Sequence, residues 1–206
     1  MSPAVGRRGV LKGGFGVVGG ALLLPAASGR PAVAEEPGQV WSSGKSQNGW
    51  PVVGDVPVTA VEGSALLVGM LSGDVATVLL HCARRLCYEL GEVDAIAGHT
   101  TTREVKAPFE SNYLSGTAIA IRPAGYPVGV AGGFFAREVA VIRDVLAECD
   151  GVVRWGGDLR PAKESHFQID VPPGDSRLAA AAAKIASWRS EPGEGAGTIA
   201  TLLRRG

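Results

Sequence analysis

The chain has 206 residues, of which 46% are hydrophobic, and it carries 20 Lys and Arg against 20 Asp and Glu. This length suits one domain, with or without a tail; the apolar fraction is too high for a disordered chain, and no Gly repeat points to a fibre. The balanced charge leaves no basic surplus to neutralise phosphates, so we do not expect a nucleic-acid partner. With only three His and three Cys, any metal site must be small.

The first 34 residues have the pattern of an export signal. Arg7 and Arg8 open the segment, an uncharged run covers residues 13–24, and AVA at 32–34 forms a small-x-small cleavage site. This pattern is typical of a secretory signal peptide, and the paired arginines resemble the twin-arginine type. The run is too short for a membrane-spanning helix, which needs roughly 20 apolar residues. We therefore expect a secreted, extracellular protein that does not span a membrane.

The chain after the leader begins with an extended segment and a helix. Residues 35–60 are rich in Pro, Gly and Ser and predict an extended N-terminal segment. Apolar residues at helical spacing predict a helix over residues 75–90. We expect Asp74 to cap its start and Gly91 to lie just past its end.

The rest of the chain predicts short strands between helices. The expected elements are a strand at 116–122, a helix at 134–148, strands at 152–155 and 166–171, and a helix from an Asp175 cap to about residue 189. Helices that flank a few short strands predict an α+β fold with a small antiparallel sheet. We expect a single domain over residues 61–190, followed by a linker and a short tail over 191–206.

The three cysteines leave the disulfide pattern open. Cys82 and Cys87 lie on the first predicted helix, about 140° apart around its axis, so a regular helix does not let them bridge. Cys149 follows the second predicted helix, so a Cys82–Cys149 bridge, a Cys87–Cys149 bridge and buried free thiols all stay open. There is no C-x-x-C spacing, and a thiolate metal site or redox motif is not expected.

Four segments, in order, carry a family resemblance. They are SQNGWP at 46–51, SNYLSGTAIAIR at 111–122, GVVRWGGD at 151–158 and HFQID at 166–170. Together they resemble the D-alanyl-D-alanine carboxypeptidase family, which includes VanY-like enzymes and L-alanyl-D-glutamate endopeptidases. The resemblance implies a zinc D,D-carboxypeptidase-like scaffold. In that family, the motif S-x-H-x-x-G-x-A-x-D and a later His hold zinc, which activates a water molecule, and an acidic residue shortly before the last His is the general base.

The sequence departs from this signature at the metal ligands. Tyr113 stands at the first His position and Ala120 at the Asp position, so only His166 matches a ligand. The position three residues before His166, where the resemblance places the base, holds Lys163, and Glu164 is one residue closer. One imidazole does not hold a catalytic zinc ion. We therefore expect that the family's zinc site is lost and that the protein has no cofactor.

Only two other histidines are present. His81 lies on the first predicted helix, where a surface or core role is expected. His99 lies in the segment that leads to the family's arginine and is a candidate to lean into the pocket. A set of His99, His166 and Glu164 would be a new metal site and not the family's own.

The resemblance also nominates residues for substrate binding. Arg103 matches, with a shift of one residue, the arginine that grips a terminal carboxylate, and a guanidinium fork suits that group. Ser111 and Trp155 keep the residue types of the family's motifs, and we assign them to substrate binding as well. For Trp155 a structural role as a core wall is the alternative.

Three functional hypotheses follow. The first is a peptidase-like protein that binds a peptidoglycan-type peptide or related small carboxylate without zinc-dependent cleavage. The second is a metal-free enzyme, with Tyr113, His166 and Glu164 as catalytic acid–base groups, in a role such as natural-product metabolism. The third, ranked last, is an active zinc carboxypeptidase with an atypical ligand set. The sequence leaves the ligand and the oligomeric state open.

Overall fold

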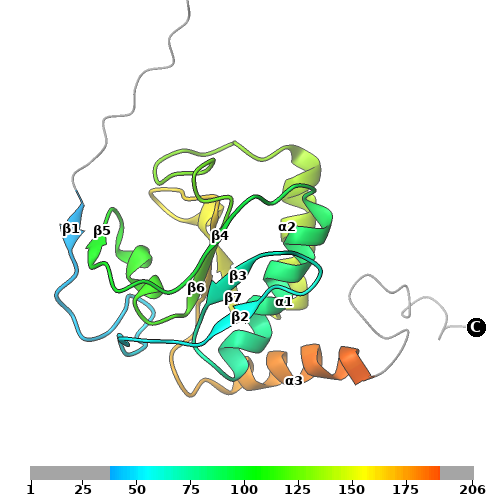
Figure 1. Cartoon of the computed structure of the whole chain (residues 1–206), viewed down its shortest axis with the longest axis horizontal. Helices are drawn as coiled ribbons and strands as arrows, with labels where there is room; N and C mark the ends of the chain where they lie inside the picture. The colour runs from blue at the N-terminus through cyan, green and yellow to red at the C-terminus, as the bar shows by residue number, and fades with distance from the viewer. Residues whose placement is uncertain (1–37, 191–206) are drawn as a thin grey trace, which may run out of the picture. The chain divides into compact units, whose positions relative to one another are not determined.

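A computed structural model describes residues 38–190 (Figure 1). The predicted leader at 1–34 and the predicted tail at 191–206 lie outside the described residues. Within the described part the fold is α+β, with helices and small antiparallel sheets, as the sequence predicts. None of the helices in this part of the chain is long and apolar enough to cross a membrane.

A four-stranded antiparallel sheet is the centre of the fold. Its strands are β4 (Ile96–Ala97), β6 (Ala118–Ile121), β8 (His166–Ile169) and β7 (Val153–Trp155), in the order β4-β6-β8-β7. Helix α1 (Asp74–Glu89) contacts β6 and β8, and α2 (Ala136–Glu148) contacts β7. Helix α3 (Ser176–Ser190) packs on α1. The helices α1 and α2 lie together beside the sheet in Figure 1.

Smaller elements surround this sheet. Strand β1 (Gln39–Val40) pairs with β5 (Glu104–Val105), and β2 (Val58–Ala60) pairs with β3 (Leu67–Gly69). Two 3₁₀-helices, η1 (Pro108–Tyr113) and η2 (Gly156–Asp158), precede β6 and follow β7. The sequence patterns did not predict these elements, because each is too short to show a hydrophobic period.

Alternation along β6 and β8 gives the sheet two different buried faces. Side chains of successive strand residues point to opposite faces. Ile119 and Phe167, which are register partners, belong to the main apolar core. The intervening positions, Ala120 opposite His166 and Ala118 opposite Gln168, therefore share the other face. One face of the sheet is apolar, and the other is small and polar.

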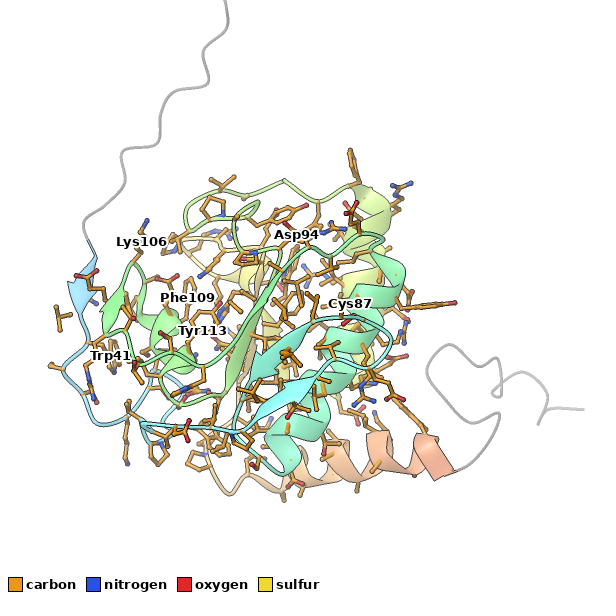
Figure 2. All side chains as sticks on the ribbon, viewed as in Figure 1. Trp41, Cys87, Asp94, Lys106, Phe109 and Tyr113 are labelled. Atoms are coloured by element: carbon orange, nitrogen blue, oxygen red, sulfur yellow. The ribbon has the colours of Figure 1, made fainter. Side chains whose placement is uncertain are left out.

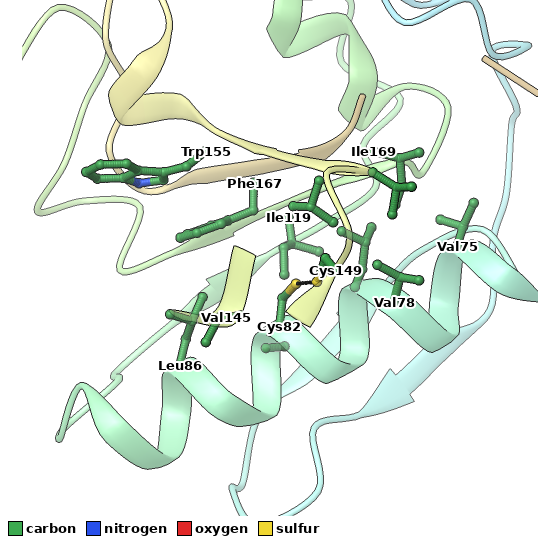
Figure 3. Close-up of a cluster of buried hydrophobic side chains, with 14 of the residues drawn as sticks. Val75, Val78, Cys82, Leu86, Ile119, Val145, Cys149, Trp155, Phe167 and Ile169 are labelled. Carbon is green, nitrogen blue, oxygen red and sulfur yellow. Dashed lines mark hydrogen bonds between the residues drawn. The ribbon is translucent and has the colours of Figure 1, made fainter. Parts of the chain in front are cut away.

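The main core lies between α1 and the apolar face. Figure 3 shows Val75, Val78 and Leu86 of α1 directed toward Ile119 and Phe167 of the sheet. All five are buried members of the main core, and their burial stabilises the packing of α1 on the sheet.

The cysteines belong partly to this core. Cys82 on α1 and Cys149 at the end of α2 are fully buried, and their Sγ atoms are 3.5 Å apart (Figure 3). Cys87 is half-buried, and all three thiols are free in the structure.

The helix boundaries test three capping predictions. The prediction that Asp74 caps α1 was wrong: the N-cap is Gly73, which has φ of +80° and no side-chain cap, and Asp74 is the first helical residue. Gly91 has φ of +76° just past the end of α1, as expected of a terminating glycine. Asp175 accepts the Arg177 backbone N–H at 2.9 Å and caps α3, as predicted.

The glycines of the Trp155-Gly156-Gly157 stretch have steric roles. A Cβ atom at Gly156 would lie 2.1 Å from the Lys163 carbonyl oxygen and 2.9 Å from the His166 Cβ atom. A Cβ atom at Gly157 would lie 2.5 Å from the Trp155 ring. The end of β7 therefore approaches the start of β8 so closely that only glycine fits.

This approach predicts the effect of one substitution. Gly156→Ala is expected to lower the free energy of unfolding by about 1–3 kcal/mol, because backbone at Lys163 has to move to make room. Urea unfolding of the two proteins measures this difference. The matched control is Gly44→Ala, where an added Cβ meets nothing within 4 Å, and its effect is expected to stay within about 0.5 kcal/mol. Equal effects at the two positions would contradict the steric role.

Candidate functional site

The polar face of the sheet carries the candidate site, and η1 covers it. Figure 2 shows Phe109 and Tyr113 on η1, which contacts β6. His166 is the first residue of β8, and its partner across the ladder is Ala120 of β6. Tyr113 forms a small buried cluster with Ala118 and Ala120. Positions 113, 120 and 166, where the resemblance places zinc ligands, thus lie around one point.

Both ring nitrogens of His166 have partners. Nδ1 lies 2.8 Å from the Tyr113 hydroxyl, and Nε2 lies 2.9 Å from the Gln168 Oε1 atom. Gln168 Oε1 also accepts from the Asn112 amide at 2.9 Å, and Gln168 Nε2 donates to Asp170 at 3.0 Å. These contacts fix Oε1 as the atom that faces the ring, so Nε2 carries the proton. Nδ1 is then the acceptor, and Tyr113 donates its hydroxyl proton to it.

Burial sets the protonation of this pair. His166 is 0% exposed, and desolvation lowers its pKa to about 4, aided by the nearby positive charge of Lys163. Tyr113 is 7% exposed, and burial, together with the negative charge of Glu110, raises its pKa well above the usual value. The imidazole is therefore neutral and the phenol protonated near pH 7.

A partly buried ion pair lies beside the Tyr113–His166 pair. The Lys163 ammonium is 2.6 Å from Glu110 Oε1 and 4.9 Å from the centre of the Tyr113 ring. The other carboxylate oxygen of Glu110 accepts the Lys106 backbone N–H at 2.7 Å. Phe109 packs against the His166 ring at a centroid distance of 4.9 Å. At the position where the resemblance places a catalytic base, the structure has a paired cation.

The structure does not bring Glu164 into the contacts of Tyr113 and His166. Its two carboxylate oxygens accept backbone N–H groups from Gly132 and Gly133, at 2.7 and 2.8 Å. Glu164 therefore anchors the loop that leads into α2. The predicted set of three catalytic groups is reduced to the Tyr113–His166 pair.

Ser111 and Trp155, which we assigned to substrate binding, are engaged inside the protein. Ser111 is fully buried, donates its hydroxyl to the Pro108 carbonyl at 2.6 Å and accepts the Gln47 backbone N–H at 2.8 Å. Trp155 is buried and donates its indole N–H to the Glu164 carbonyl at 2.6 Å. The two Ser111 hydrogen bonds tie η1 to the N-terminal segment, whereas Trp155, the ladder partner of Phe167, belongs to the apolar core, in line with the alternative of a core wall.

Arg103, unlike Ser111 and Trp155, is exposed. Its guanidinium donates to the carbonyl oxygens of Trp41 and Ser43, at 3.0 and 3.3 Å. It lines a shallow hollow of about 180 Å³. The other lining residues are Val52, Val53, Gly54, Thr101 and Leu114. Of the three residues assigned to binding, only Arg103 presents its polar group at the surface.

The N-terminal segment is a structural part of the site that the sequence reasoning missed. The Asn48 side chain donates to Thr117 Oγ1 and to the Ile169 carbonyl, both at 2.8 Å. Its backbone N–H is donated to the Asn112 side-chain oxygen at 3.1 Å. The SQNGWP segment thus fastens the N-terminal chain to the polar side of β6 and β8. Its polar residues beside Trp50 were the available sign of this role.

The other two histidines lie elsewhere. His99 contacts the Val53 carbonyl oxygen through Nε2 at 3.1 Å, and His81 contacts Glu148 at 2.8 Å. Within residues 38–190, no group of three or more His, Cys, Asp or Glu side chains is arranged to hold a metal ion. A set of His99, His166 and Glu164 is therefore not assembled in this part of the chain.

Comparison with known proteins finds no matching family model, no matching curated protein and no matching solved structure. The function is therefore argued from the geometry of the site, and the family resemblance of the four segments enters as a hypothesis.

The buried imidazole predicts a pH dependence of stability. Because the folded pKa of about 4 is below the usual 6.5, the unfolded chain takes up a proton first as the pH falls. The contribution of His166 to the free energy of unfolding is fully present above pH 6.5. The free energy of unfolding then decreases by about 3 kcal/mol as the pH falls toward 4. Urea unfolding at a series of pH values measures this loss.

The matched variant for that series is His166→Gln. We expect it to be less stable at pH 7 but to lose about 3 kcal/mol less between pH 6.5 and 4. His81, whose pKa is also lowered by burial, contributes equally to both proteins and cancels in the comparison. Identical pH profiles for the two proteins would refute the buried neutral imidazole.

Proposed function

We propose that this protein is a peptidase-like binding protein. It uses a D-alanyl-D-alanine carboxypeptidase-like scaffold to bind a peptidoglycan-type peptide or related small carboxylate, without zinc-dependent cleavage. The predicted leader at 1–34 adds that it does so outside the cytoplasm. The observation that carries the proposal is the Tyr113–His166 hydrogen bond at the point where the resemblance places the metal.

The convergence of three positions supports the scaffold. Position 113 lies in η1, 120 in β6 and 166 in β8, and the resemblance selects these positions without any knowledge of the fold. Their side chains share the polar side of the sheet. Such convergence is what a zinc site built on this sheet would need.

The chemistry of the donors supports the loss of zinc. A ligating imidazole must present a lone pair to the metal, but Nδ1 of His166 accepts from Tyr113 and Nε2 carries a proton. Ala120 has no donor atom, and the Lys163 ammonium, which is paired with Glu110, offers no lone pair to a metal. These residues do not fit the family's zinc ion.

Arg103 supports a carboxylate as the ligand. It is exposed, lines a hollow, and carries a guanidinium, whose planar fork matches a carboxylate. The hollow of about 180 Å³ is small, which suits a terminal residue more than a whole peptide. The chain terminus of a stem peptide is such a group.

The second candidate, a metal-free acid–base enzyme, is favoured by one observation, the 2.8 Å contact between the Tyr113 hydroxyl and His166. The environment weighs against it. General acid–base catalysis works best with pKa values near the operating pH, but here the pKa of the base falls to about 4 and the pKa of the acid rises. Both groups are also buried from substrate. We therefore rank this function second.

Restoring the two missing ligands tests the scaffold. Wild-type protein, purified without chelator and offered excess zinc, is expected to bind less than stoichiometric zinc. The double variant Tyr113→His, Ala120→Asp is expected to bind one zinc ion per chain, because it supplies the family's ligands around His166. Elemental mass spectrometry of the dialysed proteins measures the zinc.

The matched control moves the carboxylate by two pairs of the ladder. Tyr113→His, Ala118→Asp puts the same group on the same face, opposite Gln168 instead of His166, and is expected to bind no stoichiometric zinc. Circular dichroism shows that each variant is folded. Stoichiometric zinc in the wild type, or none in a folded Tyr113→His, Ala120→Asp variant, would sink the proposal.

Ligand binding is tested with a peptide that ends in D-alanyl-D-alanine. Calorimetry is expected to show binding, and mass spectrometry to recover the peptide intact. Arg103→Ala is expected to weaken binding about tenfold or more, as for a lost hydrogen bond to a charged group. Arg160→Ala, at another exposed arginine that donates to backbone carbonyls, is the control and should change little.

Tyr113→Phe separates the two candidate functions. A binding protein is expected to keep its affinity for the peptide, because the buried Tyr113 hydroxyl makes its hydrogen bond inside the protein, to His166. If the wild type instead releases D-alanine, and Tyr113→Phe lowers that rate by orders of magnitude, the acid–base enzyme is the right function.

A further inference from the structure

The two fully buried thiols form a pair between helices. Cys82 lies in the middle of α1 and Cys149 is the C-cap residue of α2, 67 positions later in the chain. Their Sγ atoms are 3.5 Å apart, and Figure 3 shows them directed toward each other across the core. Both residues are 0% exposed.

This arrangement requires only a small change to form a bond. An S–S bond is about 2.05 Å long, so the sulfurs must approach by about 1.5 Å. Cys149 stands where α2 ends, and Asp150 and Gly151 follow with φ of +49° and +75°. The end of a helix at a turn adjusts more readily than a helix interior, so Cys149 is the side of the pair that moves.

We propose that Cys82 and Cys149 are a disulfide-forming pair that joins α1 to the end of α2 when the protein is oxidised. The two thiols lose two protons and two electrons and form one S–S bond. A small-molecule disulfide accepts the protons and electrons and is released as two thiols. Of the two bridges that the sequence leaves open, the structure favours this one.

Cys87 is the thiol left over. It lies on α1 and is half-buried, and burial raises its pKa. In the folded protein the hydrogen bond to Cys149 and burial also raise the pKa of Cys82 well above its usual value. Little thiolate is then available, so oxidation takes place mainly while the chain folds and the thiols are still accessible.

The experiment uses the full chain. Reduced protein is unfolded, refolded in a buffer of oxidised and reduced glutathione, denatured again and treated with N-ethylmaleimide. Intact mass is expected to show one modified thiol, and peptide mapping is expected to place it at Cys87 and to find Cys82 linked to Cys149. The oxidised protein is expected to melt roughly 10 °C above the reduced protein, because the bridge closes a long loop.

Two variants, each with one cysteine replaced, complete the test. Cys87→Ala is expected to lose both remaining thiols on oxidative refolding. Cys82→Ala is expected to keep both of its thiols, since it removes one partner of the pair. Three modified thiols in the wild type, or a link that includes Cys87, would overturn the proposal. The wild-type map decides the matter even where a variant does not fold.

Discussion

The polar side of the central sheet is organised by the need of one buried imidazole for two partners. A neutral ring has one donor and one acceptor nitrogen, and leaving either unpaired away from water costs free energy. In His166 the donor is paired with Gln168 and the acceptor with Tyr113. The amide of Gln168 is oriented in turn by Asn112 and Asp170. No buried side-chain nitrogen or oxygen in residues 38–190 lacks a hydrogen-bond partner, so the network closes on itself.

The longer elements of the fold were predictable because their periods are long enough to read. Helix α1 was expected over 75–90 and extends over Asp74–Glu89, and the Asp175 cap was found as predicted. The prediction for Asp74 failed because Gly73, with its positive φ, takes the N-cap position, and a backbone dihedral leaves no mark on the hydrophobic pattern. Strands of two or three residues, such as β1 and β4, show no measurable alternation. These short strands are defined by pairing with segments that are distant in the chain, and such pairing cannot be seen in the local sequence.

Part of the candidate site was predictable, for a related reason. The meeting of Tyr113 and His166 was expected from the family resemblance alone, because both stand at positions where that family holds its zinc ion. The location of the Glu164 carboxylate was not predictable, because side chains of adjacent residues can point to opposite sides. This carboxylate accepts hydrogen bonds from the backbone of Gly132 and Gly133. The roles of Asn48 and Asn112 depend on contacts with chain more than sixty residues away. Only the fold reveals such long-range hydrogen bonds.

Under the proposed resemblance to the carboxypeptidase family, the residues that differ from its signature compensate one another physically. An aspartate at position 120 without a metal would be a carboxylate buried beside a neutral imidazole, and an uncompensated buried charge costs several kcal/mol or more. Ala120 removes that charge. The ammonium of Lys163 is neutralised by Glu110, and the hydroxyl of Tyr113 donates to Nδ1 of His166. Changing one of these positions alone would therefore leave an unpaired charge or an unpaired nitrogen. This coupling explains why the site is stable as a neutral, fully bonded structure and why we propose binding without metal-dependent cleavage.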